Sequence, residues 1–136
     1  MGMARFLDAA ASTGDRSAAR TLVGRVAPYA SQIITPAGSL ILGATARPLA
    51  RAATILGDYD RAEDWFAMTH DIHARIQTPF FSALGRLDHA DLCLTRLVGA
   101  DIRRARDLAT AAATIAAEYG CAGLTKRAET LLAQLQ

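Results

Sequence analysis

The sequence predicts an all-α fold, a stack of antiparallel helix hairpins, and three observations favour it. Alanine, the strongest helix former, accounts for 30 of the 136 residues. Aromatic residues make up only 6% of a chain that is 51% hydrophobic, so the core must consist of small and aliphatic side chains. Amphipathic runs of helical length are separated by short segments rich in glycine, proline and aspartate. Such short connections make consecutive helices antiparallel neighbours.

The N-terminal part is expected to hold two short helices. Residues 3–13 form an amphipathic run with Phe6, Leu7 and Ala10 on one face. Asp15 precedes a second run and is suited to cap it, because a carboxylate there accepts hydrogen bonds from the free N–H groups of a helix start. A proline at position 28 should end this second helix.

The middle of the chain predicts a loop and then a helix hairpin. The residues Thr-Pro-Ala-Gly at 35–38 indicate the loop. A helix over 45–56 follows and stops at Gly57, which is suited to a left-handed C-cap. One of the two aspartates directly after it, Asp58 or Asp60, caps the next helix, which extends to about residue 77.

Three more helices are predicted in the C-terminal part. The pair Thr78-Pro79 combines an N-cap residue with a proline at the first helical position, and opens a helix to about residue 97. Asp101 caps the next helix, which ends at Gly120. A last helix, over about 123–135, carries an apolar stripe that consists of Leu124, Ala128, Leu131 and Leu135.

Charge and cysteine content exclude several functional classes. The net charge is +2, and no basic face with interleaved aromatic residues indicates direct contact with nucleic acid. Cys93 and Cys121 are too few for a secreted disulfide framework, and no apolar run reaches the roughly 18 residues of a membrane span. We therefore expect a cytoplasmic protein. Lys126 is the only lysine among 15 basic residues, a bias typical of high-GC bacterial genomes.

The segment 56–66 resembles the centre of a tetratricopeptide repeat (TPR), which pairs a helix A with a helix B. Such a repeat has a turn glycine, an aromatic residue shortly after it, and then a small residue and a second aromatic in helix B. Gly57, Tyr59, Ala62 and Phe66 occupy these positions. Ala62 would let helix B approach helix A closely, at the small position Ala50.

A second, degenerate copy follows the first. Ala90 matches Ala50 at a spacing of 40 residues, and Ala105 matches Ala62 at 43. Both spacings exceed the 34 residues of a standard repeat. We therefore expect TPR-like repeats over about 45–77 and 79–119 and a capping helix at about 123–135, in one domain over 1–136. The resemblance implies a right-handed superhelix.

A wider pattern is similar to the C-terminal region of bacterial LuxR-type transcription regulators and of the adenylate-cyclase-like signalling ATPases, with an actinobacterial source implied. It covers about residues 18–132. Its matching residues are Ala27-Pro28-Tyr29-Ala30, Gly43, Leu56-Gly57-Asp58-Tyr59, Arg86-Leu87, Ala90, the run from Arg103 to Leu108, Gly123-Leu124 and Arg127-Ala128. The resemblance implies a regulatory fragment of a larger multidomain chain.

Residues that could carry chemistry are few. His89 and Cys93 lie four apart on one predicted helix, a spacing that lets an imidazole base meet a thiol nucleophile, but Cys93 falls at a core position. His70, His73 and Glu63 could hold zinc, although a solvated helix face explains them better. No phosphate-binding glycine loop is present. We expect no catalytic residue, metal or cofactor.

The sequence thus predicts a non-catalytic module that binds protein: another domain of the parent chain, a signalling partner or a second copy. The A helices of TPR-like stacks line the concave side, which gives the candidate partner-binding residues Arg47, Arg51, Thr54, Leu87 and Asp91. Arg51 could instead pair with Asp91, and Leu87 could belong to the core. Two alternatives remain open: a small-molecule sensor with its ligand near Trp65, and a hydrolase that uses Cys93 and His89.

Overall fold

The computed structural model describes residues 2–36 and 40–136 of the chain, and in these ranges the fold is all-helical. Seven α-helices are formed, and the only β pairing in the described ranges is an isolated bridge between Ile33 and Ala44. The chain, for which the sequence predicts one domain, divides into two compact units, Met1–Arg75 and Ile76–Gln136. Of the predicted loop at 35–38, Ala37 and Gly38 lie outside the described residues.

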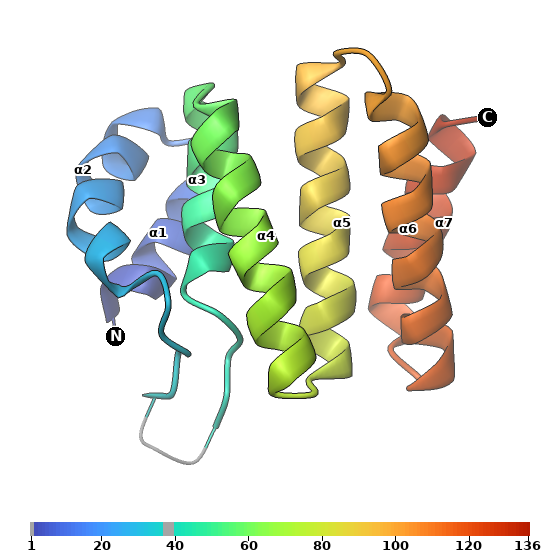
Figure 1. Cartoon of the computed structure of the whole chain (residues 1–136), viewed down its shortest axis with the longest axis horizontal. Helices are drawn as coiled ribbons and strands as arrows, with labels where there is room; N and C mark the ends of the chain where they lie inside the picture. Colours follow the sequence, from blue (N-terminus) through green and yellow to red (C-terminus); the bar gives the residue numbers. More distant parts are fainter. Residues whose placement is uncertain (1, 37–39) are drawn as a thin grey trace. The chain divides into compact units, whose positions relative to one another are not determined.

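The first unit contains four α-helices and a short 3₁₀ turn (Figure 1). Helix α1 packs against α2 and α3, and α3 packs against both α2 and α4. The elements are α1 (Gly2–Thr13), α2 (Arg16–Val26), η1 (Ala27–Tyr29), α3 (Ala46–Leu56) and α4 (Tyr59–Arg75).

Two predicted helix boundaries of this unit are confirmed in atomic detail. The Asp15 carboxylate accepts a hydrogen bond from the Ala18 N–H at 3.0 Å, so Asp15 is the N-cap of α2. Gly57 ends α3 in the left-handed region at φ 77°, and its N–H donates to the carbonyls of Ala53 and Thr54. This closure lets the chain reverse into α4 within two residues.

The buried face of α1 differs from the prediction at one residue. Leu7 and Ala10 are buried as expected, but Phe6 is 68% exposed, and Ala4 and Ala11 complete the face instead. The reason is the helical period: positions 4, 7 and 11 follow the i, i+3, i+7 spacing of one stripe, whereas position 6 lies about 100° from position 7.

The segment between α2 and α3 is held by backbone hydrogen bonds and by one side chain of α4. The Ile34 N–H donates to the Gly43 carbonyl at 2.8 Å, and the Thr45 N–H donates to the Gln32 carbonyl at 2.9 Å. Buried His73, near the end of α4, accepts a hydrogen bond at Nε2 from the Ala44 N–H at 2.9 Å. This contact ties the start of α3 to the far end of its hairpin partner.

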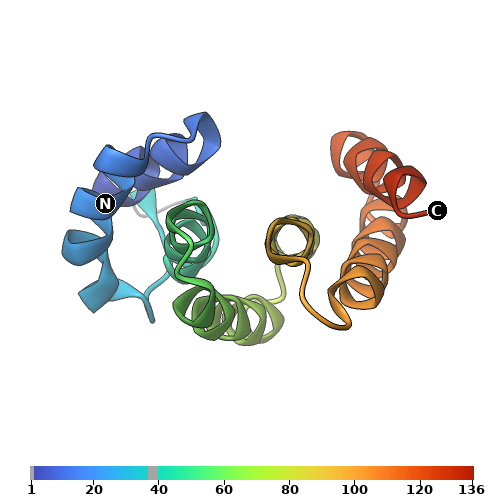
Figure 2. The same ribbon diagram turned by 90° about the horizontal axis from the view of Figure 1, so that it is seen from above.

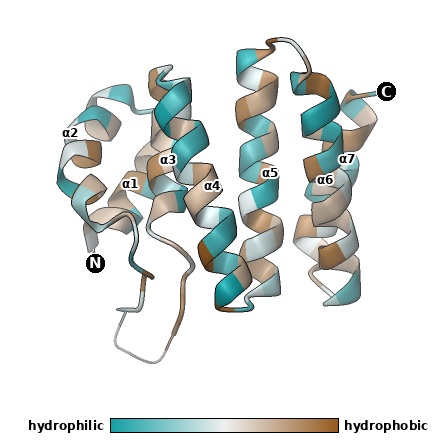
Figure 3. Ribbon diagram, in the orientation of Figure 1, coloured by the Kyte–Doolittle hydropathy of each residue, from teal (hydrophilic) through white to brown (hydrophobic). Residues whose placement is uncertain are grey.

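The second unit is a three-helix group, which Figure 2 shows from above, with α5 seen end-on. It contains α5 (Pro79–Arg96), α6 (Asp101–Glu118) and α7 (Ala122–Gln134), and α6 packs against both of the others. Hydrophobic and hydrophilic residues alternate along the helices (Figure 3). Alanines of α6 form the centre of its core, together with the predicted stripe of α7. That stripe is therefore covered by α6.

The start of α6 corrects one predicted cap. Asp101 is the first residue inside α6 and does not occupy the N-cap, which is Ala100. Its buried carboxylate instead accepts hydrogen bonds from the Val98 N–H at 2.8 Å and from both ends of the Arg96 guanidinium. These bonds stabilise the turn between α5 and α6, where Leu97 adopts a left-handed φ of 51°.

The small positions of both predicted repeats are buried where helices cross. Ala50 and Ala62 have no exposed surface and lie in the packed pair α3 and α4. Ala90 and Ala105 are equally buried in the pair α5 and α6. Phe66 is fully buried, as its predicted role requires.

Candidate interaction groove

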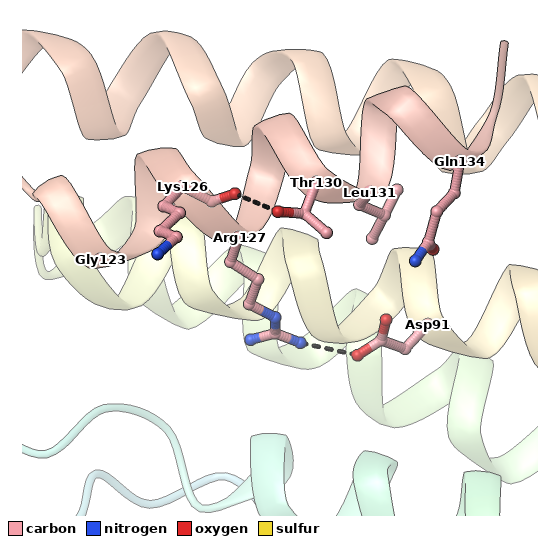
Figure 4. Close-up of a pocket in the computed structure, with 7 residues that line it drawn as sticks. All are labelled: Asp91, Gly123, Lys126, Arg127, Thr130, Leu131 and Gln134. Carbon is pink, nitrogen blue, oxygen red and sulfur yellow. Dashed lines mark hydrogen bonds and ion pairs between the residues drawn. The ribbon is translucent and has the colours of Figure 1, made fainter.

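The groove of the second unit lies between α5 and α7 and has a volume of about 400 Å³ (Figure 4). Helix α7 supplies most of its wall: Leu131 of its apolar stripe lines the groove together with polar residues beside that stripe. The lining residues are Asp91 of α5 and Gly123, Lys126, Arg127, Thr130, Leu131 and Gln134 of α7.

Arg127 joins the two walls of the groove through an ion-pair network. Its guanidinium donates to the Asp88 carboxylate at 2.9 Å and to the Asp91 carboxylate at 2.6 Å. The Asp88 side chain is only 2% exposed, whereas that of Asp91 is 53% exposed. Burial lowers the pKa of Arg127, but the two carboxylates outweigh it, and the pKa lies above its ordinary value. Arg127 is thus a structural cation whose single charge is more than offset by the two carboxylates that it binds.

Lys126 is the uncompensated charge of the groove. It is exposed, its side chain extends toward the same side of α7 as that of Arg127 (Figure 4), and within the described ranges it takes part in no ion pair. Thr130 donates its hydroxyl to the Lys126 carbonyl at 2.9 Å, and its oxygen remains available as an acceptor. The groove therefore combines the Lys126 cation, the hydrogen-bonding groups of Thr130 and of the exposed Gln134 amide, and the apolar side chain of Leu131.

Of the five predicted partner-binding residues, Asp91 alone lines this groove. Leu87 is fully buried in the core of the second unit, the alternative that the sequence left open. Thr54 is buried, and its hydroxyl donates to the Ala50 carbonyl at 2.8 Å. Both residues therefore lie in the interior and not on the partner-binding surface predicted for them.

The remaining two residues, Arg47 and Arg51, have a partner inside the first unit. The Arg47 guanidinium donates to the Asp8 carboxylate at 3.0 Å, and Arg51 binds the other oxygen of the same carboxylate. Arg51 also donates to the Ser12 hydroxyl at 2.9 Å. The two guanidiniums thus bind one carboxylate, which α1 provides. Their predicted role as exposed binding residues is therefore corrected.

The groove residues that sequence reasoning missed are Lys126, Thr130 and Gln134. They recur every four residues, so they form the polar stripe of the last helix, between the apolar positions already recognised. This regular spacing, together with the presence of the only lysine in the sequence, could have identified these residues as a candidate binding stripe.

Two of the predicted chemical residues, Cys93 and His73, are fully buried. Cys93 has no exposed surface and belongs to the core of the second unit. His89 lies on the same helix, with its Nε2 3.4 Å from the Arg104 guanidinium. Among residues 2–36 and 40–136, no cluster of three or more His, Cys, Asp or Glu side chains is arranged to hold a metal ion. Nε2 of His73 is already occupied by the Ala44 N–H.

Trp65, near which a ligand was expected, is largely buried, and the Arg61 guanidinium lies 4.4 Å from its ring centroid. This cation–π contact covers part of the ring and leaves no platform for a ligand on that side. Across the described part of the chain, no helix combines the length and apolarity needed to cross a membrane.

Comparison with known proteins gives no match to a family model, a curated protein or a solved structure.

Proposed function

We propose that this chain is a non-catalytic, TPR-like helical-repeat module that binds a protein segment in the groove between α5 and α7. The pairing of helices supports the repeat assignment. Three consecutive pairs of helices pack as hairpins: α1 with α2, α3 with α4, and α5 with α6. The second helix of a hairpin also packs against the helix that follows it, as α2 does against α3 and α6 against α7. We infer that these hairpins stack as a right-handed superhelix, and that the parent is a cytoplasmic bacterial signalling regulator.

The observation that carries the proposed function is the unpaired cation of Lys126 beside the neutralised Arg127. A ligand carboxylate placed in the groove would meet Lys126 without competition from Asp88 and Asp91, which bind Arg127. The Gln134 amide and the Thr130 hydroxyl can pair with the peptide groups of an extended segment, and Leu131 can contact an apolar side chain. The preferred ligand is therefore an extended peptide with an acidic residue next to an apolar one.

The burial of Cys93 argues against the hydrolase alternative. A thiol acts as a nucleophile only where it is ionised and can reach its substrate, and a side chain within an apolar core meets neither condition.

Selection from a random peptide library, with the full chain as the target, tests the proposal. We expect enrichment of peptides that combine Asp or Glu with an apolar residue. Lys126→Glu should weaken the binding of an enriched peptide at least about tenfold, because it replaces attraction in the groove by repulsion.

Arg103→Glu is the matched control. Arg103 is an exposed basic residue of α6 outside the groove, so this variant changes the net charge equally and should keep the wild-type affinity. A selection without enrichment would contradict the proposal, as would enriched peptides that bind Lys126→Glu as tightly as the wild type.

A further inference from the structure

The first unit contains a separate cavity of about 300 Å³, which has no part in the groove between α5 and α7. It lies between α1, the end of α2, the turn η1 and the residue that precedes α3. Among the described residues its wall consists of Met3, Ala4, Val26, Tyr29, Gln32 and Thr45, and Gln32 comes from the segment between η1 and α3. Its volume lies at the lower end of the range of small-molecule sites, roughly 300–1,000 Å³.

The most informative group in the wall is the Thr45 hydroxyl. Thr45 is only 5% exposed, and within residues 2–36 and 40–136 its hydroxyl makes no hydrogen bond. Although it occupies the N-cap of α3, it caps no N–H group. Its backbone N–H already donates to Gln32, so only the side chain remains available. The hydroxyl oxygen itself is not fully buried: it is open to the cavity, where the polar group of a ligand can form a hydrogen bond with it.

The rest of the wall restricts the kind of ligand. Met3, Ala4 and Val26 give an apolar surface, and the Tyr29 ring adds an aromatic one. Gln32 is exposed and offers an amide that can both donate and accept. None of the described residues that line the cavity is charged, so an ionised ligand would lose its hydration without gaining a counter-charge from them.

We propose that this cavity binds a small, uncharged and mainly apolar molecule whose hydroxyl or carbonyl group forms a hydrogen bond with Thr45. The site is distinct from the one that the sequence suggested near Trp65, where Arg61 covers the ring. It stands independently of the peptide groove, because all of its residues belong to the first unit.

Methyl NMR of the full chain, titrated with benzyl alcohol, tests this site directly. Four wall residues carry methyl groups: Met3, Ala4, Val26 and Thr45. We expect their signals to shift saturably, with a dissociation constant in the millimolar range that suits so small a probe. The signal of Ala128, in the core of the other unit, should not move. Benzoate and benzylammonium, which have the same ring and carry a charge, should cause no saturable shift.

Two variants separate a specific site from general apolar contact. Thr45→Val keeps the shape and removes the hydroxyl, and should weaken benzyl alcohol about three- to tenfold. Thr21→Val, at an exposed threonine of α2, is its matched control and should bind as the wild type does. Ala4→Leu fills the cavity and should abolish binding, and it decides the matter if Thr45→Val does not fold. The proposal fails if the four methyl signals do not shift saturably, if benzoate binds equally well, or if the folded variants retain wild-type affinity.

Discussion

Arg127 shows how a single residue both attaches a helix and shapes a binding surface. Its guanidinium connects α7 to two carboxylates of α5, and one of these, Asp88, is almost fully buried. A buried carboxylate depends on its counter-charges because the protein interior solvates it poorly. The adjacent Lys126 has no such structural contact, so the two neighbouring cations have different roles.

We expect Arg127→Met to lower the free energy of unfolding by about 1–3 kcal/mol, because Asp88 stays buried and loses the Arg127 cation. The figure is reduced for the part of the Arg127 side chain that solvent reaches. Lys126→Met, at the next position, should change stability by less than about 0.5 kcal/mol. Urea unfolding of both variants measures the difference, and equal losses would contradict the assigned roles.

Asp101 gives the pH dependence expected at this scale. The pKa of its carboxyl is lowered from the ordinary 3.8 to about 2. The hydrogen bond from Arg96 is the main cause, and the hydrogen bond from the Val98 N–H adds to it, whereas burial acts in the opposite direction. Because the folded-state pKa is depressed, the stabilisation is complete above about pH 4 and is lost as the pH falls toward 2. We expect a loss of about 1 kcal/mol in this window, allowing for screening, and a smaller loss in Asp101→Asn. Urea titrations at pH 4.5 and pH 2 test it, and equal losses in both proteins would contradict it.

At the scale of helices, the hairpin of α3 and α4 depends on close contact at Ala62 and on the volume of Phe66. Both side chains are fully buried. Ala62→Leu should cost about 1–3 kcal/mol through overpacking, and Phe66→Ala about 3–5 kcal/mol through the cavity it leaves. Ala67→Leu, at an exposed position of the same helix, should be nearly neutral. If thermal unfolding gave all three variants the wild-type Tm, the packing of this hairpin would be wrongly assigned.

The turn between these helices gives a second test, based on two glycines. Gly57 has φ 77°, and a Cβ there would meet no atom within 4 Å, so Gly57→Ala should destabilise by about 1 kcal/mol through backbone strain alone. Gly24 lies inside α2 with equally open space, and Gly24→Ala should stabilise by about 0.4–1 kcal/mol. Opposite signs in chemical unfolding are expected, and the same sign for both would contradict the turn geometry.

Helix boundaries were predictable from the sequence because they depend on local groups. Asp15 and Gly57 fix the ends of α2 and α3 through bonds within a few residues. The partners of Arg47 and Arg51 were not predictable, because Asp8 lies about 40 positions away along the chain. Asp101 was assigned as a cap because an aspartate before a helix usually is one, but Arg96 and Val98 bind its carboxylate instead.

At the scale of the whole molecule, each unit joins two of its helices by an ion-pair network, and the charge patterns of the two networks are opposite. In the first unit, two arginines of α3 bind one aspartate of α1. In the second, two aspartates of α5 bind one arginine of α7. The predicted surface on α3 is occupied by α1, whereas the groove beside α7 remains open. The sequence could place both sets of charges on their helices, but it could not show which set was already paired.

The central claim, that the groove between α5 and α7 binds an acidic peptide, is tested most directly by amide NMR of the full chain. An enriched peptide is titrated into the isotope-labelled protein. The expected result is saturable shifts at the groove residues, above all at Lys126, Thr130 and Gln134 of α7 and at Asp91 of α5. Shifts confined to the first unit, or shifts that persist unchanged in Lys126→Glu, would contradict the claim.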